Sequence, residues 1–213
     1  MYIDFLTFML VNQAAGLTLL ACYVYWDVDR TDQKRWAPGF ALSGLAAVLL
    51  WLRLVFAWPL PGSFNLLYGE PSLFFGILLL MMAAVAWLEL DLLPVAVYGT
   101  FAGFVSFLLG IQVLNLGLTK SPFLSGVSFL WTGLVGVFAV PMLRYRRLHA
   151  FKVFGASGLG VAALLWALLG FNAYWGHVEP FMSWRPLTQQ YQQEMQKPPL
   201  PVQPQPALPP QSK

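Results

Sequence analysis

The chain has 213 residues, of which 58% are hydrophobic and 10% are charged, and its mean hydropathy is +0.64. This composition is too apolar for a soluble domain. The formal net charge is only +3, so we do not expect nucleic acid as a partner. The single cysteine, Cys22, excludes a disulfide within the chain.

Six apolar runs are each long enough to cross about 30 Å of hydrocarbon at about 1.5 Å per residue. The first begins directly after Asp4 without a basic leader, which predicts a retained span and not a cleaved signal peptide. The predicted fold is therefore all-α, a six-transmembrane-helix bundle over residues 1–178. The predicted spans are Phe5–Trp26, Gly39–Trp58, Pro71–Leu88, Leu93–Leu114, Phe123–Leu143 and Val153–Tyr174.

The C-terminal end of the sequence changes abruptly in composition from Pro186, where Gln and Pro dominate. Such a segment has too little apolar surface to offset the entropy of ordering. We therefore predict a flexible tail over residues 179–213 on the extracytoplasmic side. We also expect that truncating the chain after Pro186 leaves membrane insertion unchanged.

The distribution of Lys and Arg predicts the orientation. Cytoplasmic connectors carry an excess of basic residues. On one side of the predicted membrane lie seven of them, and near the other side lie only Lys120 and Arg185. The first side is then cytoplasmic, and both termini are extracytoplasmic, which suits a multi-pass inner (plasma) membrane protein. The seven are Arg30, Lys34, Arg35, Arg144, Arg146, Arg147 and Lys152.

A polar, Pro- and Gly-punctuated loop, residues 59–71, separates the second and third predicted spans. Arg53 lies about 7–8 Å below Trp58, at about 1.5 Å per residue, and an arginine at this depth is costly unless it snorkels or is paired. It could pair with Glu70 and hold two helices in register. Alternatively, it could belong to an outward-opening pocket for a polar or anionic headgroup. The hypothetical ligand-binding residues are Arg53, Asn65, Glu70, Gln112, Asn115, Lys120 and His177.

Several reactive constellations are absent from the sequence. His149 and His177 fall at opposite ends of the sixth predicted span, which excludes a bis-histidine haem within one chain. There is no CxxC, no HExxH and no phosphate-binding loop. A metal site made by Asp4, Glu70 and His177 would draw on three separate segments and is a weak hypothesis. We predict no catalytic residues, no metal and no cofactor, and an enzyme is the less favoured class.

Glycines recur at helix-packing spacing, for example Gly99 with Gly103 and Gly133 with Gly136. Small residues let helix backbones approach closely inside a membrane, where apolar burial gives little driving force. We expect them to pack helices within the chain; a homo-oligomeric interface is the alternative.

Three stretches resemble one known family: PLPGSFNLLYGEPSLFFG, LNLGLTKSPFLSG and the YWGH that ends the last span. They are similar to the uncharacterised prokaryotic membrane family called domain of unknown function 981, over about residues 1–178. The resemblance implies a bacterial or archaeal inner membrane. It implies no activity and provides no catalytic residues.

Three functions remain open at this point. The first is a non-catalytic accessory or scaffold subunit that binds a membrane-protein partner, or a second copy of itself, through a structured outer face. The alternative is a carrier or a lipid- or quinone-binding protein with a polar outer pocket around Arg53. The third is a membrane enzyme that uses an outer acid such as Glu70. In every case the lipid bilayer is the first partner.

Overall fold

The computed structural model describes residues 4–29, 32–57 and 64–182, and all the regular structure in these segments is helical. It divides the chain into two compact units, Met1–Trp175 and Gly176–Lys213, and each is considered by itself. The predicted tail falls outside the described residues from residue 183 onward. The elements are α1 (Phe5–Trp26), the 3-10 helix η1 (Lys34–Trp36), α2 (Ala37–Ala57), α3 (Phe64–Leu88), α4 (Leu93–Leu116), α5 (Pro122–Val137), α6 (Ala139–Arg144) and α7 (His149–Met182).

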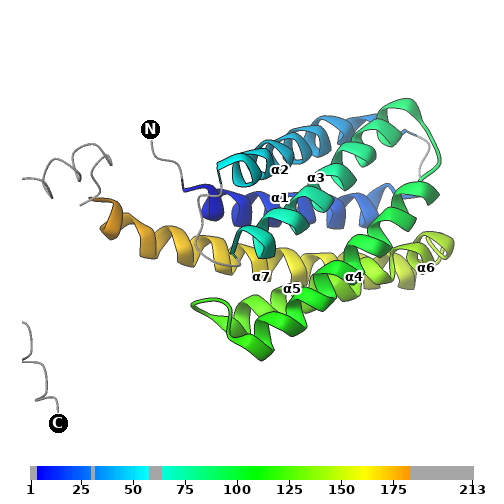
Figure 1. Cartoon of the computed structure of the whole chain (residues 1–213). Coiled ribbons are helices and arrows are strands. Elements are labelled where there is room, and N and C mark those ends of the chain that lie inside the picture. The colour runs from blue at the N-terminus through cyan, green and yellow to red at the C-terminus, as the bar shows by residue number, and fades with distance from the viewer. Residues whose placement is uncertain (1–3, 30–31, 58–63, 183–213) are drawn as a thin grey trace, which may run out of the picture. The chain divides into compact units, whose positions relative to one another are not determined.

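Within the first unit, helices that follow each other along the chain pack side by side in antiparallel pairs (Figure 1). The closest pairs are α2 with α3 and α4 with α5, and α1 packs on α2. The helix α7 lies against both α1 and α5: Gly170 faces Val11, and Trp131 donates a hydrogen bond of 2.9 Å to the carbonyl of Gly158. Short connections favour this arrangement because they leave successive helices as neighbours.

Five of the described helices are long and apolar enough to cross a membrane: α1, the stretch from η1 through α2, α3, α4 and α7. Their outward faces carry large exposed apolar side chains, for example Leu42 on α2 and Phe101 on α4. The all-helical part of the prediction is confirmed, and these helices are those of a multi-pass membrane protein. The six predicted spans do not each correspond to one long helix among the described residues, because α5 by itself is shorter than the other five.

The predicted fifth span, Phe123–Leu143, is interrupted at Phe138, where α5 ends and α6 begins. Pro141 explains the break. It has no N–H to donate to the carbonyl four residues earlier, and its ring clashes with that carbonyl. The backbone of Phe138 therefore leaves the helical path for one residue, with φ −85° and ψ 7°.

The predicted start of the third span was wrong. The sequence suggested that the helix begins at Pro71, because proline favours a first helical turn. In the structure α3 begins at Phe64, and Pro71 lies inside it. Membrane helices tolerate an internal proline where neighbouring groups satisfy the freed backbone. As a result, Glu70 lies within the helix and does not precede it.

Glycines bring α4 and α5 close together, as the sequence predicted. A Cβ atom on Gly133 would lie 2.4 Å from the backbone nitrogen of Phe107, and one on Gly103 would lie 2.6 Å from that of Val137. The helices α2 and α3 meet in the same way, where a Cβ on Gly44 would lie 2.9 Å from the carbonyl oxygen of Gly76. Glycine is required at these contacts because any side chain would separate the two backbones.

Candidate functional site

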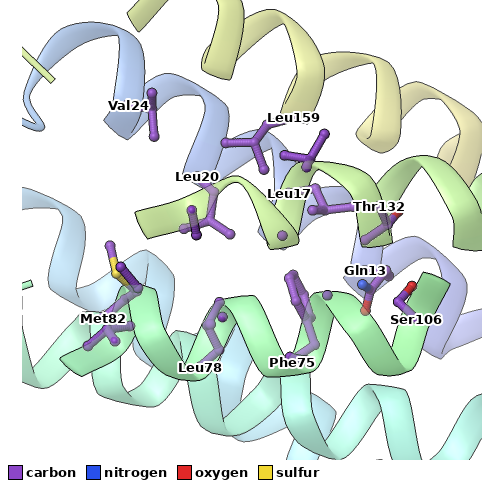
Figure 2. A pocket seen from close by; sticks show the side chains of 18 of the residues that line it. Gln13, Leu17, Leu20, Val24, Phe75, Leu78, Met82, Ser106, Thr132 and Leu159 are labelled. Atoms are coloured by element: carbon purple, nitrogen blue, oxygen red, sulfur yellow. The ribbon is translucent and has the colours of Figure 1, made fainter. Parts of the chain in front are cut away.

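The helices of the first unit enclose a cavity of about 200 Å³ (Figure 2). It is lined by α1, α3, α4, α5, α6 and α7, but not by α2. One water molecule needs only about 10–15 Å³ measured in this way. The cavity is therefore large enough for a ligand of many atoms.

The middle of the cavity is apolar. Figure 2 shows Leu17, Leu20 and Val24 of α1 lining it from one side, with Leu78 and Met82 of α3 across the space. These side chains offer no hydrogen bond. An apolar wall of this kind favours hydrocarbon over a polar solute.

Three aromatic side chains from different helices gather at the end of the cavity remote from the α6–α7 connection. The ring of Phe129 on α5 meets Trp166 of α7 edge-on, with centroids 4.9 Å apart, and lies 5.8 Å from the ring of Tyr68 on α3. Phe129 and Trp166 are almost fully buried. These rings wall off this end of the cavity with rigid, well-packed groups.

Polar side chains from three helices meet near these aromatics. Gln13, Ser106 and Thr132 all line the cavity and lie in one region of it (Figure 2). Ser106 donates a hydrogen bond of 2.9 Å to the carbonyl of Phe129, and Thr132 accepts one of 2.8 Å from the indole of Trp166. The carboxamide of Gln13 makes no hydrogen bond to any described residue. Gln13 thus offers both a donor and an acceptor to the cavity.

The other end of the cavity is basic. Arg146, in the turn between α6 and α7, and Lys152, in the first turns of α7, both line it. The ammonium of Lys152 lies 3.2 Å from a carboxylate oxygen of Asp29. Arg146 makes no ion pair with an acid in the described part of the chain. The cavity therefore runs from a neutral aromatic end to a basic end with a cationic group available, and this basic end, at Arg146 and Lys152, is called the mouth below.

Beside this mouth, the connection from α1 to α2 is held by a buried carboxylate. Asp27 is almost fully buried and accepts hydrogen bonds from the guanidinium of Arg35 and, at 2.6 Å, from the indole of Trp36. Tyr23 donates a hydrogen bond of 2.7 Å to Gln33 in the same connection. The ring of Trp36 also stacks with that of Phe40. This corner fixes one rim of the cavity.

The seven predicted ligand-binding residues do not line the cavity. Arg53 is exposed near the end of α2, and its guanidinium carbon lies 5.4 Å from the centroid of the Phe5 ring. No ion pair between Arg53 and Glu70 occurs among the described residues. Asn65 is buried in the first turn of α3, whereas Glu70 is exposed.

The remaining predicted residues lie elsewhere. Gln112, Asn115 and Lys120, around the α4–α5 connection, are exposed and make no side-chain hydrogen bond or ion pair with a described residue. His177 lies near the end of α7, in the second compact unit. Among the described residues, no group of three or more His, Cys, Asp or Glu side chains could hold a metal ion. Whether these seven residues bind a ligand stays a prediction.

Sequence reasoning did not identify the residues that line the cavity. The first span contains the neighbouring polar residues Asn12 and Gln13, and the sequence alone does not separate their roles. In the structure the amide of Asn12 donates a hydrogen bond of 3.0 Å to the carbonyl of Ser43 on α2, whereas Gln13 faces the cavity. The available signal was a glutamine in an apolar run. Only the rotation of α1 about its axis shows that this glutamine faces the cavity.

A family model described as "Protein of unknown function (DUF981)" matches residues 1–180, which is most of the chain. The chain belongs to the DUF981 family. All the cavity-lining residues lie within the matched region of this DUF981 protein. The family resemblance predicted from the three loop stretches is thus confirmed. No curated protein and no solved structure matches the chain.

Proposed function

We propose that this DUF981 protein is a multi-pass protein of a prokaryotic inner membrane that binds a long, apolar-chain molecule between its helices. It would act as a lipid-binding protein or a carrier, without catalysing a reaction. The observation that carries this proposal is the cavity, with its apolar middle and its polar groups at both ends. It replaces the outer pocket around Arg53 as the most favoured binding site.

The proposal includes six membrane crossings. The helices α5 and α6 follow one another with a single irregular residue between them, so Pro122–Arg144 together can form the fifth crossing. A proline break inside a crossing is tolerated where other bonds satisfy the freed backbone groups, and here the amide of Met142 donates a hydrogen bond of 2.9 Å to the carbonyl of Phe138. The excess of Lys and Arg at the α1–α2 and α6–α7 connections supports a cytoplasmic position for that end. Both termini are then extracytoplasmic.

The dimensions of the cavity fit a chain molecule. Lys152 and Trp166 both line it, and they are separated by about 21 Å along α7, at about 1.5 Å per residue. That is about two thirds of the roughly 30 Å of hydrocarbon in a bilayer. The walls between these residues are mainly aliphatic and aromatic. A saturated or isoprenoid chain has no hydrogen-bonding groups, so it can lie in such a space without leaving a buried donor or acceptor unpaired.

The test is to fill the cavity and measure binding of a simple probe, hexadecanol, to the protein purified in detergent micelles. Ala102 lines the cavity from α4, and Ala84 is exposed on α3 and does not line it. We expect Ala102→Phe to weaken hexadecanol binding at least tenfold and Ala84→Phe to leave it unchanged. Equal binding by both variants and the unchanged protein would overturn the proposal, provided that their melting temperatures agree.

The accessory or scaffold role is a separate proposal that rests on the sequence. It predicts that a membrane-protein partner, or a second copy of the chain, co-purifies from native membranes in stoichiometric amounts. Purification in a mild detergent followed by mass spectrometry distinguishes the two proposals. A carrier needs no such partner.

A further inference from the structure

The acidic side chains near the basic mouth of the cavity already have partners within the protein. The five described acidic residues at this end each accept from a basic side chain or from the amide of a residue that begins a helix. Glu89, for example, lies 2.9 Å from the ammonium of Lys34, and Asp91 accepts a hydrogen bond of 3.0 Å from the amide of Leu93. The five are Asp27, Asp29, Asp32, Glu89 and Asp91.

The arginines after α6 have no such partner. Arg144, Arg146 and Arg147 make no ion pair and no side-chain hydrogen bond with a described residue. Arg144 and Arg147 are exposed and water can solvate them, but Arg146 is half-buried and lines the cavity. A guanidinium beside an apolar space is costly unless an anion compensates it.

We infer that Arg146 binds the anionic headgroup, a phosphate or a carboxylate, of an amphiphile whose hydrocarbon chain occupies the cavity. This inference rests on the proposed function and adds the class of ligand and its direction. The headgroup lies at the α6–α7 turn and the chain points toward the aromatic end, at Phe129 and Trp166. Arginine suits this role because its planar fork donates two parallel hydrogen bonds to a phosphate or carboxylate.

Lys152 also favours placing the headgroup at the α6–α7 turn, although it is not the main residue that binds the headgroup. Its ammonium lies at the mouth but is paired with Asp29, at 3.2 Å from the nearer carboxylate oxygen. It therefore adds positive potential and can offer one of its hydrogens to a headgroup that Arg146 holds. At the opposite end the lining groups are neutral: Tyr68, Phe129 and Trp166. An anion has no cation there to compensate its desolvation.

The experiment compares hexadecyl phosphate with hexadecanol, which has the same chain and no charge, in binding to the full-length protein in neutral detergent. We expect hexadecyl phosphate to bind at least tenfold more tightly. We expect Arg146→Gln to remove this advantage, because a hydrogen-bonded ion pair is lost, so that the ratio of the two affinities falls to about one. Arg147→Gln is the matched control, since Arg147 is exposed and does not line the cavity; it should change neither affinity.

Three results would overturn the inference. The first is equal affinity for the two probes. The second is that hexadecyl phosphate binds undiminished to Ala102→Phe, which would place the headgroup on the outer surface without its chain in the cavity. The third is that inorganic phosphate competes as well as hexadecyl phosphate, which would show a simple anion site. If instead neither hexadecanol nor hexadecyl phosphate binds, the proposed function itself is overturned. Melting temperatures of all variants show that each is folded.

Discussion

The indole nitrogen of Trp166 donates a hydrogen bond of 2.8 Å to the hydroxyl oxygen of Thr132, which joins α7 to α5 at the aromatic end of the cavity. Because the hydroxyl oxygen accepts this bond, its own hydrogen stays available for another acceptor. The same Trp166 ring packs edge-on against Phe129. Trp166 therefore both lines the cavity and orients a polar group beside it.

This relationship predicts that Trp166→Phe destabilises the protein. The aromatic contact is largely kept and the hydrogen bond is lost, so the free energy of unfolding should fall by about 0.6–1.5 kcal/mol. Thr132→Val should cost a similar amount, and the double variant should cost less than the sum. Equilibrium unfolding in mixed micelles measures this. Trp175→Phe is the control, because Trp175 is 87% exposed; a loss there of the same size would show that the effect is not specific.

The unpartnered carboxamide of Gln13 predicts a change of the opposite sign. Gln13→Leu removes a half-buried polar group that no described residue satisfies and should raise the free energy of unfolding by about 1 kcal/mol or more. Gln112→Leu alters an exposed glutamine and should change stability by less than about 0.5 kcal/mol. If Gln13→Leu lowers the stability instead, the amide serves the fold and not a ligand.

The contact between α4 and α5 predicts a strong effect of a single methyl group. A Cβ on Gly133 would lie 2.4 Å from the backbone nitrogen of Phe107, so Gly133→Ala should destabilise by about 1–3 kcal/mol. Gly160 on α7 is the matched control, because nothing lies within 4 Å of a Cβ placed there. Gly160→Ala should stabilise slightly, by up to about 1 kcal/mol. Thermal unfolding of both variants separates a packing effect from a general effect of alanine.

The proposed orientation predicts the outcome of reporter fusions. Fusions after Asp32 and after His149 should report cytoplasm, because the basic connections stay inside. A fusion after Ser63, between α2 and α3, should report the exterior. A cytoplasmic signal from the fusion after Ser63, together with external signals from the other two fusions, would show that the orientation in the membrane is the reverse of the proposed one. The mouth at Arg146 would then face the other leaflet.

The sequence predicted most helix positions closely because an apolar run of sufficient length has few alternatives to a helix in a membrane. The start of α1 at Phe5 and of α4 at Leu93 follow the prediction. The structure differs from the predicted helices at two prolines. Pro71 lies inside α3, and Pro141 divides the fifth predicted span. At Pro141 the missing N–H and the ring divide the helix, whereas at Pro71 the chain stays helical on both sides of the proline.

The family, the all-helical class and the close glycine contacts were determined by the sequence itself, since local spacing and loop motifs carry that information. The candidate site was decided by the tertiary structure alone. Nothing in the one-dimensional pattern shows that Asn12 contacts α2 while Gln13 faces a cavity, or that Arg146 lies at the mouth and Arg147 does not. Neighbouring residues on a helix point about 100° apart, at 3.6 residues per turn, and neighbours in a turn also point in different directions. Which of them faces the space between helices depends on how the whole bundle is rotated and packed.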